Sequence, residues 1–104
     1  MTTKLKKWDV QDHLRTPRQV EAFWDAILSE SEGDAKVLTS ALNEIARSKG
    51  MAELAKKAGM TRAGLYKALG PAGNPSFASM MRLLHTMRLA PFSRAERTGQ
   101  AARR

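Results

Sequence analysis

The chain has 104 residues and a mass of 11.5 kDa, enough for one compact domain and too little for two. Hydrophobic residues are 42% and charged residues 27% of the sequence, a balance typical of globular rather than disordered proteins. The absence of cysteine excludes disulfides, zinc–thiolate sites and thiol catalysis. No apolar run approaches the roughly 20 residues of a membrane helix, and the first residues lack a secretory signal, so we expect a cytoplasmic protein without membrane contact.

Charge is distributed unevenly along the chain. Eighteen Lys and Arg residues against ten Asp and Glu residues give a net charge of +8. Residues 1–34 hold five basic and seven acidic residues, whereas residues 35–104 hold thirteen basic and three acidic residues. This asymmetry is typical of a protein whose basic part binds a polyanion and whose N-terminal segment has another function. A basic protein without any polyanion partner would show the same composition.

Two long helices are predicted in the first half of the chain, and no stretch alternates long enough for a strand. The tetrapeptide Thr16-Pro17-Arg18-Gln19 has the N-cap, the proline and the glutamine of a capping box. Asp34 follows Gly33 and predicts the second helix start. Apolar residues at three- and four-residue spacing follow both caps, so each helix has one apolar face.

Three shorter helices are predicted in the second half. We expect them at about 51–58, at about 62–69, and after Asn74-Pro75, which we take as the cap of the last one. The apolar stripe of the last helix comprises Phe77, Met80, Met81, Leu83, Leu84 and Met87. The chain thus divides into an N-terminal segment (1–17), a helical domain (18–90) and a basic C-terminal tail (91–104). We expect the tail to be mobile, because it has almost nothing to bury.

Residues 51–69, MAELAKKAGMTRAGLYKAL, have the pattern of a helix-turn-helix. The steep helix crossing needs a small residue in the first helix, which Ala55 supplies. The turn needs a residue that tolerates positive φ, which Gly59 supplies, and Thr61 is placed to cap the second helix. An ordinary helical hairpin with a glycine turn would share these features.

The second helix of this pair separates an apolar face from a polar one. On a wheel of 100° per residue, its leucines and Ala68 cluster on one side. The opposite face carries Ala63, Tyr66 and Lys67, with Arg62 on the flank, as a surface that reads a DNA groove would. Gly64 counts against a stiff helix, because an interior glycine costs about 1 kcal/mol relative to alanine.

Other residues are candidates for phosphate contacts. Lys56 and Lys57 lie on the first helix of the pair, which in this motif commonly crosses the DNA backbone. Asn74 and Ser76 lie at a helix start, where free amides and the positive end of the helix dipole suit an anion. Each lysine taken alone can equally be a solvated surface charge, and Asn74 a plain cap.

No catalytic or metal-binding constellation is visible. His13 and His85 lie in different elements, without partners at a spacing that catalysis or metal binding requires. The sequence GPAGN at 70–74 lacks the Gly-Lys-Ser/Thr ending of a phosphate-binding loop. We therefore expect no enzymatic activity, no cofactor and no metal ion.

The segments IARSKGM, LAKKAGMTRAGLYKAL and GNPSF, with the amphipathic helix after them, resemble the addiction-module antidote proteins. These are HigA-like, Xre-type helix-turn-helix antitoxins, and the resemblance covers about residues 18–90. It implies an all-α, five-helix lambda-repressor-like domain that dimerises on palindromic double-stranded operator DNA and represses its own operon. It also implies a RelE/ParE-type toxin, neutralised by direct contact. The family's base-reading positions fall on Thr61, Arg62, Ala63, Tyr66 and Lys67.

The toxin contact is expected at the N-terminal end of the chain. RelE-type toxins are basic according to the resemblance, and residues 1–34 are acidic and contain Trp8 and Trp24 as candidate contact residues. Both tryptophans can also be core residues. Two other functions stay open: a stand-alone or phage-type transcriptional regulator without a toxin, and a protein-interaction module that no longer binds DNA.

Overall fold

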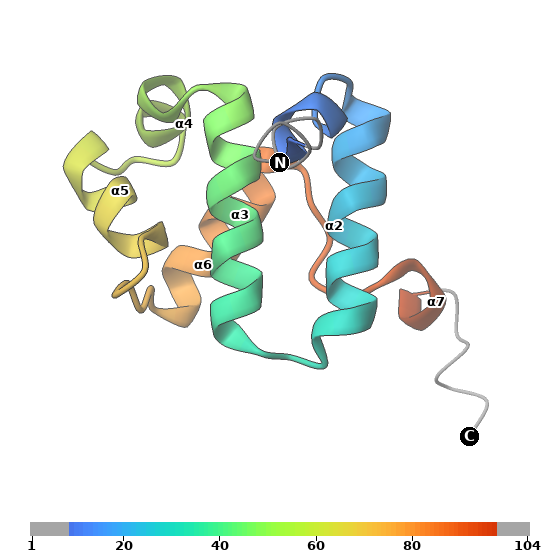
Figure 1. Cartoon of the computed structure of the whole chain (residues 1–104). Helices are drawn as coiled ribbons and strands as arrows, with labels where there is room; N and C mark the ends of the chain where they lie inside the picture. Colours follow the sequence, from blue (N-terminus) through green and yellow to red (C-terminus); the bar gives the residue numbers. More distant parts are fainter. Residues whose placement is uncertain (1–8, 98–104) are drawn as a thin grey trace, which may run out of the picture.

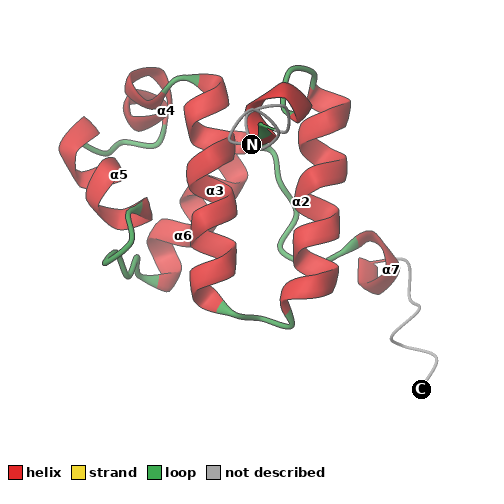
Figure 2. Ribbon diagram, viewed as in Figure 1, coloured by secondary structure: helices red, strands yellow, loops and turns green. Residues whose placement is uncertain are grey.

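The computed structural model describes residues 9–97, and every regular element in that range is a helix (Figures 1 and 2). The elements in chain order are η1 (Val10–His13), α2 (Pro17–Ser31), α3 (Ala35–Lys49), α4 (Met51–Lys57), α5 (Arg62–Leu69), α6 (Phe77–Met87) and α7 (Arg94–Arg97). The all-α prediction is therefore confirmed over these residues. None of the helices in this range combines the length and the apolar character that a bilayer crossing requires.

The two long helices begin where the sequence predicts. Thr16 Oγ1 accepts from Gln19 N at 3.1 Å, and Gln19 Oε1 accepts from Thr16 N at 3.1 Å, which completes the capping box of α2. Asp34 Oδ1 accepts from the amide of Lys36 at 2.9 Å and starts α3. Both predicted caps are confirmed. The sequence reveals them because their hydrogen bonds span only two or three residues.

The core lies where α2, α3, α4, α5 and α6 meet. Helices α2 and α3 run side by side in opposite directions, α6 lies behind them, and α4 and α5 cover one side (Figure 1). Its largest fully buried side chains are Leu42, Ile45, Leu65, Leu69 and Leu83. Burying a side chain of this size stabilises the fold by roughly 1.5–3 kcal/mol. The α4–α5 pair therefore packs on α3, and α4 also packs on α6.

The N-terminal segment packs onto the domain from Val10 onward. Val10 packs against the core cluster, and Leu14 is buried. Gln11 Nε2 donates to the side chain of Glu44 on α3 at 2.7 Å and to its carbonyl oxygen at 3.0 Å. The predicted boundary after residue 17 is thus crossed by core and hydrogen-bond contacts.

The prediction of a mobile tail from residue 91 is wrong for its first part. After α6 the chain turns back along α2, and the indole Nε1 of Trp24 donates to the carbonyl oxygen of Ala90 at 2.7 Å. Asp25 on α2 accepts from the amide of Arg94, where α7 begins, and Ser93 is buried. We call residues 88–97 the C-terminal strap. The strap is anchored by the core residue Leu89 and by polar contacts with α2, and hydropathy does not reveal the polar contacts.

Candidate nucleic-acid interface

The turn between α4 and α5 has the geometry that its residues predict. Ala55 is buried, and its carbonyl oxygen accepts from Met60 N at 2.8 Å across the turn. Gly59 has φ +71°, a backbone conformation that glycine adopts freely but that costs L residues about 1–2 kcal/mol. Thr61 Oγ1 accepts from the amide of Gly64 at 2.9 Å and caps α5. The positive φ predicted for Gly59 and the cap predicted at Thr61 are confirmed, and Ala55 is buried beside the turn.

Helix α5 presents a polar face to solvent, opposite its buried leucines Leu65 and Leu69. The exposed residues are Thr61, Arg62, Ala63, Tyr66 and Lys67, so the structure brings all the predicted base-reading residues onto one outward surface. The Arg62 guanidinium carbon lies 5.5 Å from the centroid of the Tyr66 ring. This cation–π contact holds the guanidinium over the helix face while leaving its donors free.

Two exposed lysines end α4, which lies next to the start of α5 (Figure 1). Lys57 Nζ lies 3.9 Å from the carboxylate of Glu53, whereas the described residues 9–97 contain no ion pair of Lys56. Lys57 also borders a surface hollow of about 550 Å³ together with His85 and Arg88, at the end of α6. Lys56 therefore has no acidic partner to displace among the described residues. Lys57 lies on the same hollow as the basic residues His85 and Arg88.

Asn74 and Ser76 are exposed in the loop between α5 and α6, but the cap of α6 differs from the prediction. Ser76, not Asn74, is the N-cap, since its Oγ accepts from Ser79 N at 3.1 Å. The loop path explains the difference. A Cβ built on Gly73 would lie 2.1 Å from the carbonyl oxygen of Ala68, so only glycine allows this approach to the end of α5. That contact fixes the helix start two residues later.

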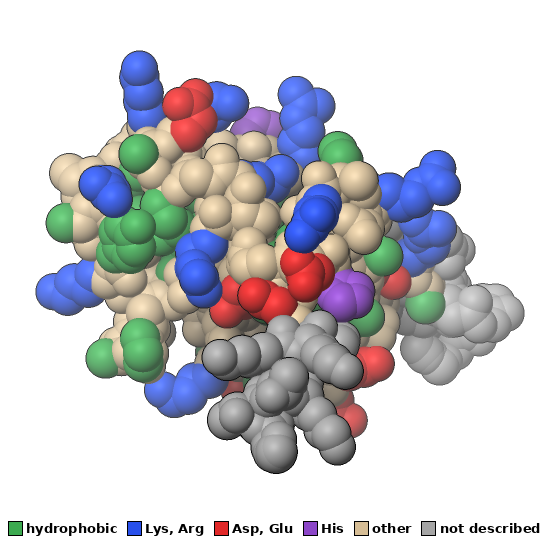
Figure 3. Space-filling model, turned by 45° about the horizontal axis from the view of Figure 1, so that its top comes forward, with side chains coloured by type: hydrophobic (Ala, Val, Ile, Leu, Met, Phe, Trp, Pro, Cys, Tyr) green, Lys and Arg blue, Asp and Glu red, His purple; other side chains and the backbone are tan. Residues whose placement is uncertain are grey.

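Charge differs between the first described residues and the residues around α4–α6. Residues 50–90 carry the basic side chains Lys56, Lys57, Arg62, Lys67, Arg82 and Arg88, and Glu53 as their one acidic residue. Residues 9–34 carry seven acidic residues and two arginines. Figure 3 shows Lys and Arg side chains over most of the view, including the α4–α5 side, and most of the Asp and Glu side chains gathered near its centre. The exposed face of α5 is therefore electrostatically suited to a polyanion.

The prediction that Trp24 contacts a toxin is wrong for this conformation. Trp24 is only 3% exposed, packs in the core, and uses its indole N–H to bind Ala90. The core alternative therefore holds for Trp24. Trp8 lies outside the described residues.

The histidines lie far apart in the sequence and in different elements. His13 belongs to η1, where its Nδ1 lies 3.4 Å from the carbonyl oxygen of Asp9, and His85 is exposed on α6. In the described part of the chain, no three His, Cys, Asp or Glu side chains lie close enough together to hold a metal ion.

Comparison with known protein families identifies the chain. Residues 4–93 match the family model described as "Probable addiction module antidote protein". The chain belongs to this antidote family. A protein of Haemophilus influenzae (strain Rd), named only as uncharacterized, is 39% identical over 89 residues, which cover 86% of this chain and 90% of that protein. No solved structure matches the sequence significantly. Membership implies a role in a toxin–antitoxin system and, in general terms, a toxin partner.

The antidote also exposes apolar residues that the sequence placed in its core. Phe77 at the start of α6 is 80% exposed, and Met81, one turn later, is 37% exposed. Val37 on α3 is 40% exposed. Helical periodicity places all three on the apolar face of their helix. It does not show which edge of that face a neighbouring helix covers, so it could not predict their exposure. Their exposure makes them candidates for contacts with other molecules.

Proposed function

We propose that this antidote is a cytoplasmic DNA-binding antitoxin, which neutralises a RelE/ParE-type toxin by direct contact and represses its own operon. In this proposal it acts by binding alone and not by catalysis. The observation that carries the DNA-binding part is the outward face of α5. Arg62, Tyr66 and Lys67 are exposed together on a helix that packs against α3 and α4. The surrounding residues 50–90 have Glu53 as their one acidic residue. The family match supports the antitoxin part.

The α4–α5 pair then acts as a helix-turn-helix, with α5 in the major groove. Arg62 can donate two hydrogen bonds to O6 and N7 of a guanine, and its stacking on Tyr66 limits the conformational freedom that it gives up on binding. Ala63 suits contact with a thymine methyl group, and Lys67 offers a further donor. The hydroxyl of Thr61 accepts the capping bond and keeps its own proton for a phosphate or a base.

Phosphate contacts would flank α5 on both sides. Lys56 and Lys57 lie near its start, and the loop that carries Asn74 and Ser76 lies beyond its end (Figure 1). Ser76 satisfies one amide at the start of α6, and the remaining first-turn amides of that helix suit a phosphate oxygen. Such contacts give affinity and register but carry no sequence information.

We further propose a homodimer that places two copies of α5 on two half-sites, about 34–36 Å apart along the DNA. Phe77 and Met81 are a candidate dimer surface, because they lie one turn apart on α6 and are exposed in the single chain. A two-fold axis would pack this patch against its own copy. Burying two such side chains per subunit would remove apolar area from water in both chains.

The DNA-binding proposal is tested with two variants that act differently. Arg62→Ala should weaken binding to the DNA upstream of the antidote's own reading frame by roughly ten- to a hundredfold, while random DNA is bound almost as before. Lys56→Ala should weaken both alike and should reduce the slope of the salt dependence by about one unit, because one phosphate is no longer neutralised. Mobility shifts at several salt concentrations measure both effects.

The stability of both variants should stay near that of the wild type, because neither side chain lies in the core. Equal reductions on operator and random DNA in Arg62→Ala would mean that α5 anchors the protein without reading bases. If the wild type does not bind its upstream DNA at all, the protein-interaction alternative replaces the repressor.

A further inference from the structure

A shallow groove of about 400 Å³ lies between α2 and α3, beside η1. Its apolar lining comes from Val10 of η1, Phe23 and Ile27 of α2, and Val37 and Ala41 of α3. Phe23 and Ile27 are half-buried against the core, and Val37 is 40% exposed. Exposed apolar area in a concave place is the usual feature of a binding surface, so this α2–α3 groove is a candidate docking site.

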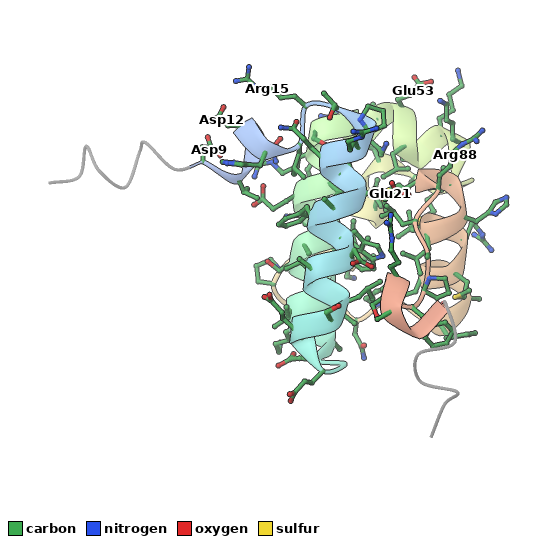
Figure 4. All side chains as sticks on the ribbon, turned by 90° about the vertical axis from the view of Figure 1, so that its right-hand side faces the viewer. Asp9, Asp12, Arg15, Glu21, Glu53 and Arg88 are labelled. Atoms are coloured by element: carbon green, nitrogen blue, oxygen red, sulfur yellow. The ribbon has the colours of Figure 1, made fainter. Side chains whose placement is uncertain are left out.

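The surroundings of the groove are acidic, in a protein whose net charge is +8. Asp9 precedes η1, and Asp12 lies within η1, 2.8 Å from Arg15. Glu44 lines the groove itself and lies 3.4 Å from Arg47. At the other end, the connection from α2 to α3 carries Glu32 and Asp34, while Lys36 is the cation of the lining. Figure 4 shows Asp9 and Asp12 on the opposite side of α2 from Arg88 and α6.

This distribution of charge indicates the kind of partner that fits. A nucleic acid is repelled from a surface with carboxylates at both ends, so the groove does not extend the proposed DNA surface. A protein segment with an apolar side chain between Lys or Arg residues would bury the side chain in the groove and place its cations near the carboxylates. The groove is lined by residues of η1, α2 and α3, whereas α5 lies on the other side of α3 from α2 (Figure 1). A partner bound in the groove therefore leaves α5 exposed.

We propose that the α2–α3 groove is where the toxin docks, through a cationic segment with an apolar anchor. This inference rests on the proposed antitoxin function and assigns it a surface. Trp24 is buried, so the inference assigns the apolar toxin contact to Val37, which lines the groove and is exposed. Affinity comes mainly from the apolar anchor, and the carboxylates speed association and exclude anionic partners.

The experiment compares Val37→Lys with Thr39→Lys in the full chain. Both variants add the same charge to α3, but Thr39 is not part of the groove lining and borders instead a hollow shared with Leu69 and Pro71. The probe is the small protein encoded by the reading frame next to the antidote. Each variant is co-expressed with it, growth is scored, and the affinity of the purified pair is measured by calorimetry. We expect Val37→Lys to bind at least about tenfold more weakly and Thr39→Lys to bind within about threefold of the wild type.

A second variant and a mapping experiment guard against misfolding. Ser40→Lys changes an exposed residue that lines both the groove and the hollow beside Thr39. It should weaken binding where Thr39→Lys does not, with an unchanged circular dichroism spectrum. In the wild type, titration with the probe should shift the amide NMR signals of residues 36–44. If instead the shifts fall on α4–α5 or α6, or if Val37→Lys changes only the oligomeric state of the antidote, the groove is not the toxin site.

Failure of the antitoxin function itself would look different. If the wild type neither restores growth nor binds the probe, the function proposed above is wrong and the inference falls with it. If the wild type restores growth and Val37→Lys does so with unchanged affinity, the antitoxin function stands and the groove assignment is overturned.

Discussion

Glu32 is held in a conformation that its side chain disfavours. It ends α2 with φ 53° and ψ 35°, in the left-handed region, which costs L residues about 1–2 kcal/mol. Glycine adopts this region freely but gives up more backbone entropy on folding. We therefore expect Glu32→Gly to raise the free energy of unfolding by about 0.5–1 kcal/mol, as measured by urea denaturation.

The matched control is Glu30→Gly, two residues earlier and within α2. There the backbone is helical, so glycine should lower the free energy of unfolding by about 1 kcal/mol. Opposite signs for the two variants would locate the strain at the backbone of Glu32. A decrease of stability in both would mean that the carboxylate of Glu32 matters more than its φ angle.

At the scale of an element, the start of α5 depends on two residues that constrain each other. The amide of Gly64 donates to Thr61 Oγ1, and a Cβ built on Gly64 would lie 2.8 Å from that same oxygen. Gly64→Ala should therefore leave stability almost unchanged, because about 1 kcal/mol of helix propensity is offset by displacement of the cap. Thr61→Ala alone should lower stability by about 1 kcal/mol.

The double variant decides between this coupling and simple additivity. Without the Thr61 hydroxyl, Gly64→Ala meets no clash and should gain the full helix propensity, about 1 kcal/mol. Thermal and chemical unfolding of the four proteins give the coupling energy. An equal effect of Gly64→Ala in both backgrounds would show that the cap moves aside freely. The absence of a side chain at Gly64 thus leaves room for the capping hydroxyl of Thr61.

Prediction from the sequence succeeds for elements whose ends are fixed locally. The capping box at Thr16, the cap at Asp34 and the glycine turn at Gly59 involve neighbours within three or four residues, so short patterns reveal them. The predicted cap of α6 is wrong because Asn74 and Ser76 are both good capping residues. The contact of Gly73 with the end of α5 selects between them, and no local pattern encodes that contact.

The polar face of the candidate site is also predictable, since α5 buries its leucines and exposes Arg62, Tyr66 and Lys67 in the expected order. The exposure of Val37 and Phe77 is not, because it depends on which neighbouring helix lies over the edge of each stripe. The C-terminal strap escapes prediction for a similar reason. Its anchors join residues that are distant in the sequence, and helical periodicity carries no information on such pairs.

At the scale of the whole molecule, Trp24 holds the strap against α2. Trp24→Phe keeps an aromatic ring in the core but leaves the carbonyl oxygen of Ala90 without its donor, which costs about 1–3 kcal/mol. We expect stability to fall by an amount in that range, and hydrogen exchange to become faster in residues 88–97 than in α4 and α5. Tyr66→Phe, which removes a hydroxyl from an exposed ring, should change stability by less than about 0.5 kcal/mol. Uniformly faster exchange would mean that strap and core open as one unit.

The C-terminal strap also determines the order in which contacts form during translation. The contacts between α2 and α3, and between α4 and α5, join neighbours in the chain and can form while translation continues. The hydrogen bond of Trp24 joins residues 66 positions apart, so it has to wait until Ala90 has left the ribosome. Until then the indole N–H lacks this partner, and the nascent domain is completed only when its last core helix and the strap emerge together.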